Sequence, residues 1–404
     1  MNILLINHYA GSPAHGMEYR PYYFARQWIN AGHDVTILAA TYSHLRSTQP
    51  AAHRAVTTEM IDGIRYIWFR TPAYEGNSPQ RVLNMLSFTA QLWMRHTAGV
   101  SFDLVIDSST YPLTIFSTHH IARKHSARLV FEVHDLWPLS PIELGRYSRR
   151  HPYIMAMQYA EDFAYRKSHR VVSFLPKAKE YMMSRGMAPD KFVYIPNGID
   201  TSAWNTAEPL PAAHTELFRR LRHEGKFVVG YTGAHAIANA LDTLIRAAGL
   251  LREDAGIHMV LVGQGQEKEK LMTLAAGLGL DNISFLPAVP KTCMPGLLAE
   301  IDVCYIGFQD QPLFRFGISP NKLMDYMMAA KPILHAIKAG NDLVVESGCG
   351  ISVPPEDPDA VAAAIRTLSV HSPADLQGMG EKGRMYVTAN HDYAVLARRF
   401  LESM

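Results

Sequence analysis

Residues 314–332 have the sequence FRFGISPNKLMDYMMAAKP, and the interpretation of the whole chain starts from this stretch. It predicts a glycine turn, then a helix, then a strand that begins at 332–334. Gly317 lets the backbone come close to a ligand, and Ser319 followed by Pro320 is typical of a helix cap and first turn. The stretch therefore predicts a helix that begins at this pair with its first amide groups unpaired.

Lys322 and Asp325 lie in the first half of this predicted helix. A positive charge in the first turn opposes the helix dipole, so Lys322 indicates a negative group opposite it. Asp325 follows three residues later, which places both side chains on one helical face. A ligand with phosphates and hydroxyls explains this pattern, with Lys322 and amides on the phosphates and Asp325 on a hydroxyl pair. A capped helix with an ordinary salt bridge explains it as well.

The length and composition indicate a two-domain α/β protein. A chain of 404 residues is too long for one ordinary core, and 48% hydrophobic residues are enough to fill two. The 39 basic and 37 acidic residues nearly cancel, which argues against a nucleic-acid partner. The few cysteines, Cys293, Cys304 and Cys349, occur in apolar contexts and predict buried thiols in a reducing cytosol.

The first residues, MNILLIN, predict a buried strand and lack the charged segment of a signal peptide. No run of about 18 apolar residues predicts a membrane span. A polar loop with Gly16 follows the first strand, then a helix at about 20–31 and a second strand at 33–39. This is a βαβ unit, which places the Gly16 loop at the carboxyl end of a strand, where open α/β sheets bind ligands. A plain connecting loop remains the alternative.

Further strands are predicted at 64–69, 102–107, 129–133 and 170–174, and they complete a doubly wound first domain. His134 follows one of these strands directly and is therefore placed at the same ligand-binding edge. It either contacts a sugar hydroxyl or satisfies a loop carbonyl. The helix predicted over 77–97 mixes aromatic and basic groups, including Arg81, Trp93 and Arg95. It is either an amphipathic core helix or a helix that dips into lipid headgroups.

A basic loop follows, with Arg146, Arg149 and Arg150 between a glycine and a proline. It is either an ordinary solvated loop or a contact for an acceptor pyrophosphate or an anionic membrane.

The second half repeats the opening pattern of strand, glycine turn and helix. A strand at 227–233 ends in Gly233, and His235 lies in the turn that follows. The next strand ends at Gly263 and Gly265, where glycines either admit a nucleotide phosphate or ribose or form a plain turn. Asp357 and Asp359 form an Asp-x-Asp pair. We assign this pair to a helix N-cap rather than to a metal site.

The combined motifs resemble family 4 of the GT-B retaining glycosyltransferases, over nearly the whole chain. The motifs that carry the resemblance are the 314–332 stretch, the phrase AGHDVT at 31–36, the HD pair at 134–135 and IPNGID at 195–200. The Ser-Pro-Asn-Lys version before the acid is most similar to bacterial WbuB-like amino-sugar (L-fucosamine type) transferases of O-antigen and surface polysaccharide synthesis.

This resemblance implies two facing Rossmann-like domains with an interdomain cleft. The acceptor domain is expected at 1–195 with a returning helix at about 386–404, and the nucleotide-sugar domain at 196–385. The implied catalytic residues are His134, Lys322 and Asp325. The implied donor-binding residues are Gly16, Gly233, His235, Gly263, Gly265, Val289, Phe316, Gly317, Ile318 and Asn321. The implied acceptor or membrane contacts are Arg81, Trp93, Arg146, Arg149 and Arg150.

The chain departs from the family pattern at three positions. The usual arginine and lysine that hold the donor diphosphate are replaced by Ala234 and Asn239, and the first of two family acids is replaced by Gly317. The phosphate contacts are then expected from amides and Lys322, with His235 or Arg315 as further candidates. Because no carboxylate occupies the first acid position, a front-face attack fits better than a double displacement.

The predicted function is metal-independent transfer of a hexose-type sugar with retention. The donor is expected to be a nucleotide sugar, a UDP-linked N-acetyl amino sugar, acting as co-substrate without a cofactor. The acceptor is expected to be a glycan or a polyprenyl-pyrophosphate-linked glycan, with no nucleic acid involved. The location is cytoplasmic, with peripheral contact to the inner face of the plasma membrane as an extension. The alternatives are a catalytically impaired GT-B scaffold and a non-hydrolysing UDP-GlcNAc epimerase.

Overall fold

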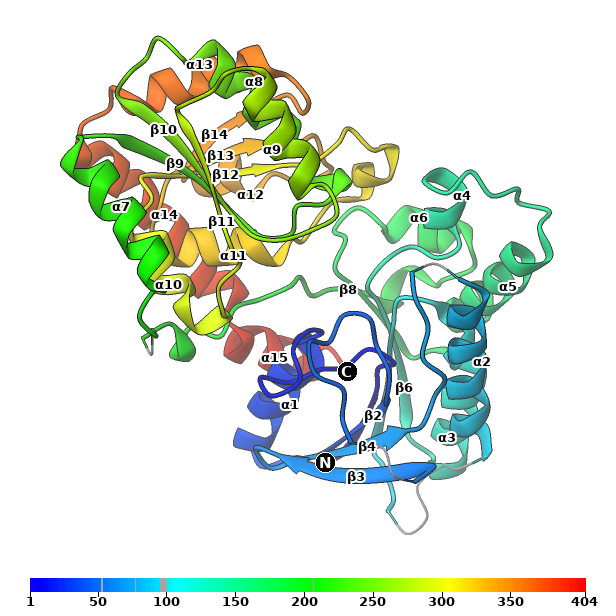
Figure 1. The fold of residues 1–404 in the computed structure, drawn as a ribbon. Coiled ribbons are helices and arrows are strands. Elements are labelled where there is room, and N and C mark those ends of the chain that lie inside the picture. Colours follow the sequence, from blue (N-terminus) through cyan, green and yellow to red (C-terminus); the bar gives the residue numbers. More distant parts are fainter. Residues whose placement is uncertain (52–53, 77, 95–99, 206) are drawn as a thin grey trace. The chain divides into compact units, whose positions relative to one another are not determined.

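The computed structural model describes residues 1–51, 54–76, 78–94, 100–205 and 207–404. The chain divides into two compact units (Figure 1). Unit 1 comprises Met1–Asn197 and Tyr393–Met404, and unit 2 comprises Gly198–Asp392.

Unit 1 is built on an eight-stranded sheet of order β3-β4-β2-β1-β5-β6-β7-β8. Every pairing is parallel except that of β3 with β4. The order reverses at β1, and ligands of doubly wound sheets bind at such a reversal, outside the strand carboxyl ends. The strands are β1 Asn2–Ile6, β2 Asp34–Ala40, β3 Val56–Ile61, β4 Ile64–Phe69, β5 Leu104–Ser109, β6 Arg128–Val133, β7 Arg170–Ser173 and β8 Phe192–Tyr194.

Helices cover both faces of this sheet (Figure 1). α1 and α15 pack on one face, where the Trp28 indole N–H donates to the Ala397 carbonyl at 3.1 Å. α2 and α3 lie side by side on the other face. The helices are α1 Arg20–Asn30, α2 Pro79–Met94, α3 Ile115–His125, α4 Leu139–Glu143, α5 Pro152–Lys167, α6 Lys179–Ser184 and α15 Tyr393–Glu402, with 3₁₀ turns η1 Pro112–Thr114 and η2 Pro189–Lys191.

The sequence prediction differs from unit 1 at both edges of the sheet and in α2. At one edge, 170–174 was predicted as the last strand of this domain, but β8 pairs with β7 beyond it. The edge strand β3 was not predicted, because its half-buried, partly polar pattern lacks the continuous apolar run of the buried parallel strands. The helix predicted over 77–97 is described as α2 from Pro79 to Met94, and residues 77 and 95–97, including Arg95, lie outside the described residues.

Unit 2 contains a six-stranded, fully parallel sheet of order β11-β10-β9-β12-β13-β14. In chain order this is 3-2-1-4-5-6, the arrangement of dinucleotide-binding folds, with the reversal at β9. The strands are β9 Phe227–Thr232, β10 Ile257–Val262, β11 Ile283–Leu286, β12 Val303–Gly307, β13 Ile333–Ala336 and β14 Gly350–Val353.

Two hydrophobic cores lie on the faces of this second sheet. α8, α9 and α13 contribute to one core, and α7, α10, α11, α12 and α14 to the other. The elements are α7 Ala212–His223, α8 Leu241–Leu250, α9 Lys268–Gly277, α10 Met294–Ala299, α11 Asn321–Met328, α12 Leu343–Ser347, α13 Pro358–Ser369 and α14 Pro373–His391, with η3 Ser202–Asn205, η4 Ile237–Asn239, η5 Lys291–Cys293 and η6 Pro312–Phe316.

Three details bear on the predictions. The Asp357 carboxylate accepts from the Ala360 amide and caps α13, as predicted. The three cysteines are buried and free, also as predicted. The chain returns to unit 1 at Tyr393, later than the expected position near 386, because α14 continues within unit 2 to His391.

Candidate functional site

The first turn of α11 lies close to the carboxyl end of β9 in unit 2, because Lys322 reaches the end of that strand. The helix begins at Asn321, and its cap is Pro320, whose backbone is extended at φ −75° and ψ 129°. The prediction that Ser319 caps the helix was therefore wrong. The proline already holds the backbone in the conformation that a cap requires, and no side-chain cap bond is made at this position.

Lys322 is held by neutral groups. Its Nζ donates to the Tyr231 hydroxyl at 2.7 Å and to Asn239 Oδ1 at 2.8 Å. The ammonium also lies 4.4 Å from the centre of the Tyr231 ring. The Tyr231 hydroxyl and Asn239 Nδ2 each donate to the Ala234 carbonyl, which fixes both partners in turn. These contacts orient the ammonium without neutralising its charge.

Burial lowers the pKa of Lys322 to about 7. A cation in this position lacks the carboxylate that usually compensates a buried charge: among the described residues no ion pair of Lys322 is found. The group is therefore poised to gain a proton when an anion arrives.

Asp325 faces a different partner from Lys322. Both of its carboxylate oxygens accept from Lys291 Nζ at 2.5 Å, and its side chain is largely buried. The salt bridge between Lys322 and Asp325, which the sequence left open, is not found between these two described residues. Lys291 is half exposed and belongs to η5, after the turn that holds Val289.

The loop after β10 packs tightly against the loop after β9. A Cβ on Gly263 would lie 1.9 Å from the Gly233 carbonyl oxygen, so only glycine fits there. The His235 amide donates to the Gln264 carbonyl, and the imidazole is fully buried with neither ring nitrogen hydrogen-bonded within the described protein. Burial, together with the charges of Lys268 and Lys322, lowers the pKa of His235 to about 4. A neutral imidazole therefore lies beside the lysine.

Two backbone amides that precede α11 are already in use. The Gly317 amide donates to the Phe314 carbonyl, and the Ile318 amide donates to Asn341 Oδ1 at 2.7 Å. Gly317 itself has φ 104°, a conformation that favours glycine. These two amides are therefore not available to a phosphate in this conformation, which leaves the ammonium of Lys322 as the larger positive feature.

The remaining predicted donor residues in unit 2 differ in their packing and exposure. Gly265 has φ 156° and packs against the His235 backbone, and Val289 packs partly buried against the core of the unit. The Phe316 ring lies 4.3 Å from the Arg315 guanidinium carbon, and Asn321 is exposed.

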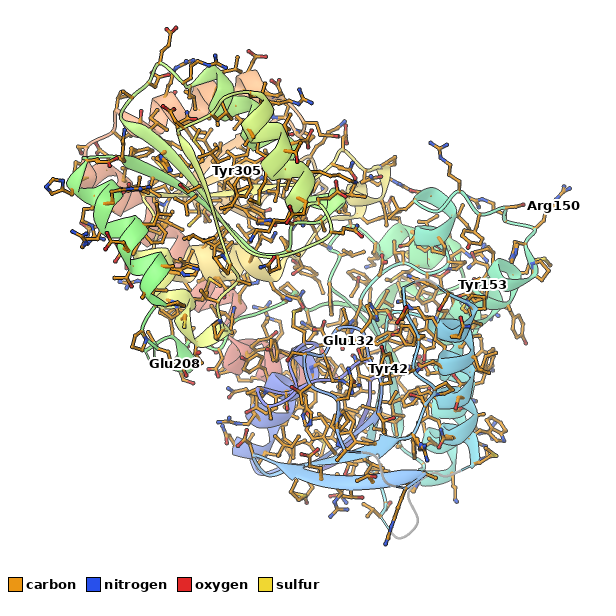
Figure 2. All side chains as sticks on the ribbon, viewed as in Figure 1. Tyr42, Glu132, Arg150, Tyr153, Glu208 and Tyr305 are labelled. Carbon is orange, nitrogen blue, oxygen red and sulfur yellow. The ribbon has the colours of Figure 1, made fainter. Side chains whose placement is uncertain are left out.

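A second polar cluster lies inside unit 1, at the carboxyl ends of β5 and β6. His134 Nε2 lies 2.7 Å from Ser108 Oγ and 3.3 Å from Glu132 Oε2. The other carboxylate oxygen of Glu132 accepts from Arg20 Nε at 3.1 Å and Arg20 Nη2 at 2.9 Å. Figure 2 labels Glu132 in the interior of this unit. Histidine, serine, carboxylate and guanidinium thus form one connected cluster.

Arg20 is buried at the start of α1 and has further partners. Its guanidinium donates to the carbonyls of Ile195 at 2.9 Å and Pro196 at 2.5 Å, and it lies over the Phe24 and Phe174 rings. Burial alone would raise the pKa of Glu132, but the Arg20 charge and the hydrogen bonds from His134 and Ser108 outweigh it and lower the pKa to about 2. The cluster is therefore charge-balanced within the protein.

Two of the predicted acceptor or membrane contacts, Arg81 and Trp93, lie on different faces of α2. Arg81 turns toward Tyr9 and Tyr74, with its guanidinium carbon about 6 Å from each ring centre. Trp93 is half exposed and stacks on His120. Arg81 and Trp93 are twelve positions apart in α2, which rotates their side chains about 120° from each other, so they do not share a face. Arg146, Arg149 and Arg150 are exposed, and Arg150 projects away from its unit (Figure 2).

Gly16, predicted at the donor, lies in the loop after β1. It has φ 95°, and a Cβ there would lie 2.9 Å from the Ser47 amide nitrogen. The position therefore needs glycine for packing within the loop.

The described residues show neither a metal-ligand cluster nor a membrane-spanning helix. No group of three or more potential metal ligands is found among them, and none of the described helices has the length and hydrophobicity needed to span a bilayer.

Comparison with known proteins gives matches in both units. Residues 14–203 match the model of Glycosyltransferase Family 4, and residues 226–370 match that of Glycosyl transferases group 1. The chain is a glycosyltransferase.

Two curated relatives at low sequence identity are also named as glycosyltransferases. The glycosyltransferase is 23% identical, over 84% of its length and 85% of the relative's, to WcaI of Escherichia coli K12, named for colanic acid biosynthesis. It is 21% identical, over 79% of its length and 78% of the relative's, to WbjE of Pseudomonas aeruginosa, named as a glycosyltransferase.

A solved structure supports the fold. HepE of Anabaena, solved in complex with UDP, has a TM-score of 0.70 at 17% identity, over 100% of this chain and 99% of its own. The glycosyltransferase therefore has the GT-B fold of two Rossmann-like domains.

The sequence analysis did not identify five side chains of this glycosyltransferase that contact the candidate site residues or their partners: Arg20, Ser108, Glu132, Tyr231 and Lys291. One signal was available. An acid inside an apolar strand pattern, as at Glu132, requires a buried cation or hydrogen bonds. Its partner Arg20, 112 residues earlier, could not be identified by spacing.

Proposed function

We propose that this glycosyltransferase transfers a sugar, with retention, from a UDP-linked N-acetyl amino sugar to a glycan or polyprenyl-pyrophosphate-linked acceptor in bacterial surface polysaccharide synthesis. Unit 2 binds the donor and unit 1 the acceptor. The names of two relatives, with colanic acid biosynthesis for one of them, and the UDP bound by HepE support this choice.

Lys322 is the observation that carries the proposal. A largely buried ammonium at the carboxyl end of a central strand, held only by a phenol and an amide, offers its charge to a diphosphate. Asn239 replaces the lysine that is usual in the family. It orients Lys322 and so still contributes to binding of the diphosphate. Asp325 binds donor hydroxyls, and Lys291 orients its carboxylate until the donor arrives.

The reaction balances without a cofactor. An acceptor hydroxyl forms a new bond to the anomeric carbon on the face from which UDP leaves, while the bond from that carbon to the diphosphate oxygen breaks. The proton of the acceptor hydroxyl passes to the departing diphosphate. Lys322 stabilises the negative charge that develops on this leaving group, an electrostatic effect arranged before the reaction begins.

A catalytically impaired scaffold is the rival, favoured by Ala234 and Gly317, which carry no functional side chain. Release of the nucleoside diphosphate (UDP, GDP or ADP) from the corresponding nucleotide sugar, measured with and without a lipid-linked acceptor glycan, separates the two. We expect acceptor-dependent release of UDP that survives EDTA. Binding of UDP without release from any donor supports the scaffold, and a loss in EDTA that manganese or magnesium restores contradicts the metal-free reaction.

Membrane contact is a separate part of the proposal. The outer side of α2 exposes Leu83, Leu86, Trp93 and Met94, and the basic loop at 146–150 is exposed in the same unit. Apolar side chains in the headgroups and basic residues near anionic lipid would hold the enzyme reversibly. Each basic residue contributes about 1 kcal/mol at most.

Vesicle sedimentation tests this contact. We expect binding to phosphatidylglycerol vesicles but not to phosphatidylcholine vesicles, reduced by salt. Charge reversal at Arg146, Arg149 and Arg150 should weaken it. The matched control is reversal of the exposed Arg219, Arg220 and Arg222 on α7, which changes net charge equally. Equal losses from both triple variants would assign the effect to net charge rather than to the loop.

A further inference from the structure

We propose that Glu132 and Ser108 are positioning residues that hold His134 as the tautomer protonated on Nε2, so that Nδ1 accepts a hydrogen bond from a substrate hydroxyl. This deepens the proposed function and rests on it, because it assigns a role to a side chain of the candidate transferase site.

The Nε2 atom faces two oxygen atoms. Ser108 Oγ lies 2.7 Å away and Glu132 Oε2 lies 3.3 Å away. The histidine side chain is 7% exposed and Glu132 4% exposed, so water does not compete strongly for these contacts. A lone pair on Nε2 would face the carboxylate lone pairs at this distance, which is repulsive.

The single proton of Ser108 is already committed. Ser108 Oγ donates to Glu132 Oε2 at 2.5 Å, and it accepts from Asn7 Nδ2 at 3.1 Å. The hydroxyl therefore has a lone pair, and no proton, left for His134. A proton on Nε2 satisfies the serine oxygen and the carboxylate together.

Glu132 remains an acceptor because of Arg20. The guanidinium binds the other carboxylate oxygen twice, which leaves Oε2 for the serine and the histidine. Removal of the carboxylate charge would also remove the reason for the Nε2 proton. Arg20 thus acts on the histidine through Glu132.

The opposite ring nitrogen, Nδ1, has no hydrogen-bond partner within the part of the chain that the structure describes. Among the described residues, His134 makes its side-chain hydrogen bonds through Nε2, and none is found for Nδ1. The Phe174 ring lies 4.5 Å from the imidazole centre and limits its rotation. An imidazole protonated on Nε2 alone offers the lone pair of Nδ1, which suits the hydroxyl of a sugar.

Nitrogen-15 NMR of histidine-labelled protein tests the tautomer directly, with His134→Asn used to assign the signals. We expect Nε2 of the wild-type residue to have the shift of a protonated ring nitrogen and Nδ1 that of an unprotonated one. Glu132→Gln supplies an amide that can donate to Nε2, and it should shift the population toward the Nδ1-protonated form. A wild-type histidine protonated on Nδ1 alone overturns the proposal.

Kinetics test the consequence. UDP release from UDP-N-acetylglucosamine and from UDP-glucose should show kcat lower by about 10- to 100-fold in Glu132→Gln and Ser108→Ala. The KM for the donor should change less. The matched control is Asp162→Asn, which weakens a two-bond contact with Arg185 in the same unit; among the described residues, Asp162 makes no hydrogen bond to Ser108, Glu132 or His134. It should retain the wild-type kcat.

The outcomes separate the two levels of proposal. Wild-type kcat in both site variants, or an equal loss in Asp162→Asn after correction for folded protein, overturns the positioning role. If wild-type protein releases UDP from no donor, the proposed function fails instead. The nitrogen shifts still decide the tautomer in that case, because they need no turnover.

Discussion

Arg20, which is buried in unit 1, and Lys322, which is half-buried in unit 2, have opposite kinds of partner. Arg20 binds a carboxylate twice and two backbone carbonyls, and its charge is matched by Glu132. Lys322 binds a phenol and an amide oxygen, and no described carboxylate pairs with it. The first arrangement fixes a structure. The second leaves a charge for a ligand to balance.

This difference indicates which cation serves stability and which serves binding. A buried pair is costly to break, because the remaining partner is left charged in a poorly solvated site. A cation without a carboxylate partner is costly to bury, and an anionic ligand that pairs with it offsets part of this cost. The predictions below test this contrast, beginning with the largest effect.

Arg20→Met should lower the free energy of unfolding by about 3–5 kcal/mol, because it leaves Glu132 buried without its cation. Lys322→Met should not lower it, because no partner charge is left behind and the cost of burying the ammonium is removed. Urea denaturation of both variants without ligand measures the two values. Equal losses would remove the contrast between the clusters.

Lys322→Met should weaken UDP binding by about 2–4 kcal/mol, through loss of a charged hydrogen bond in a poorly solvated site. Titration calorimetry measures the affinity. Arg252→Met serves as a control, because that exposed arginine lies on the surface of the same unit. UDP affinity unchanged in Lys322→Met would place the diphosphate elsewhere.

Asp325→Ala should weaken binding of UDP or a UDP-sugar by roughly 1.5–3 kcal/mol, through loss of charge-assisted bonds to hydroxyls. Lys291→Ala should have a smaller effect, since it orients the carboxylate and is itself half exposed. Comparison of UDP with 2′,3′-dideoxy-UDP in both proteins locates the hydroxyls. If Asp325→Ala weakens both ligands equally, the carboxylate does not contact the ribose.

Proton uptake should accompany UDP binding above pH 7. Burial lowers the pKa of Lys322 to about 7, from 10.5 for a free lysine. The bound diphosphate favours the ammonium, so the fraction of a proton taken up rises from pH 7 toward pH 9. Calorimetry in buffers of different ionisation enthalpy measures this fraction, and Lys322→Met should abolish the uptake due to this side chain. Uptake unchanged in that variant assigns the proton to another group.

The lowered pKa of Lys322 also makes the free energy of unfolding of the unliganded protein depend on pH. Because the folded pKa of Lys322 lies below the unfolded value, burying the ammonium costs stability fully below about pH 7. This cost fades as the pH rises toward 10.5.

The sequence predicted the fold well because its main signals are local. Apolar runs near 2–7, 102–107, 227–233 and 303–306 correspond to β1, β5, β9 and β12, the strands at which the two sheets reverse. Such runs, separated by helical patterns, specify parallel sheets without knowledge of distant contacts. The edge strand β3 carries only a weak, partly polar pattern and was missed.

The candidate site was predicted less completely, for a physical reason. His134 and Lys322 were found because each occupies a marked local position, after a strand or at a helix start. What each contacts depends on residues far along the chain, as with Tyr231 and Lys322, 91 residues apart. The pairing of Asp325 with Lys291 rather than Lys322 was decided in the same way by tertiary packing. Whether these residues bind a donor stays a prediction.

The contacts of Arg20 with the Ile195 and Pro196 carbonyls bear on the design of domain-exchange chimeras. A chimera that takes its second domain from another glycosyltransferase, to change the donor, has to join after Asn197. A junction a few residues earlier would import foreign carbonyls for an arginine that also fixes Glu132. The second junction belongs between Asp392 and Tyr393, because α15 packs on α1. Donor preference could then be exchanged while the surroundings of His134 remain those of the parent.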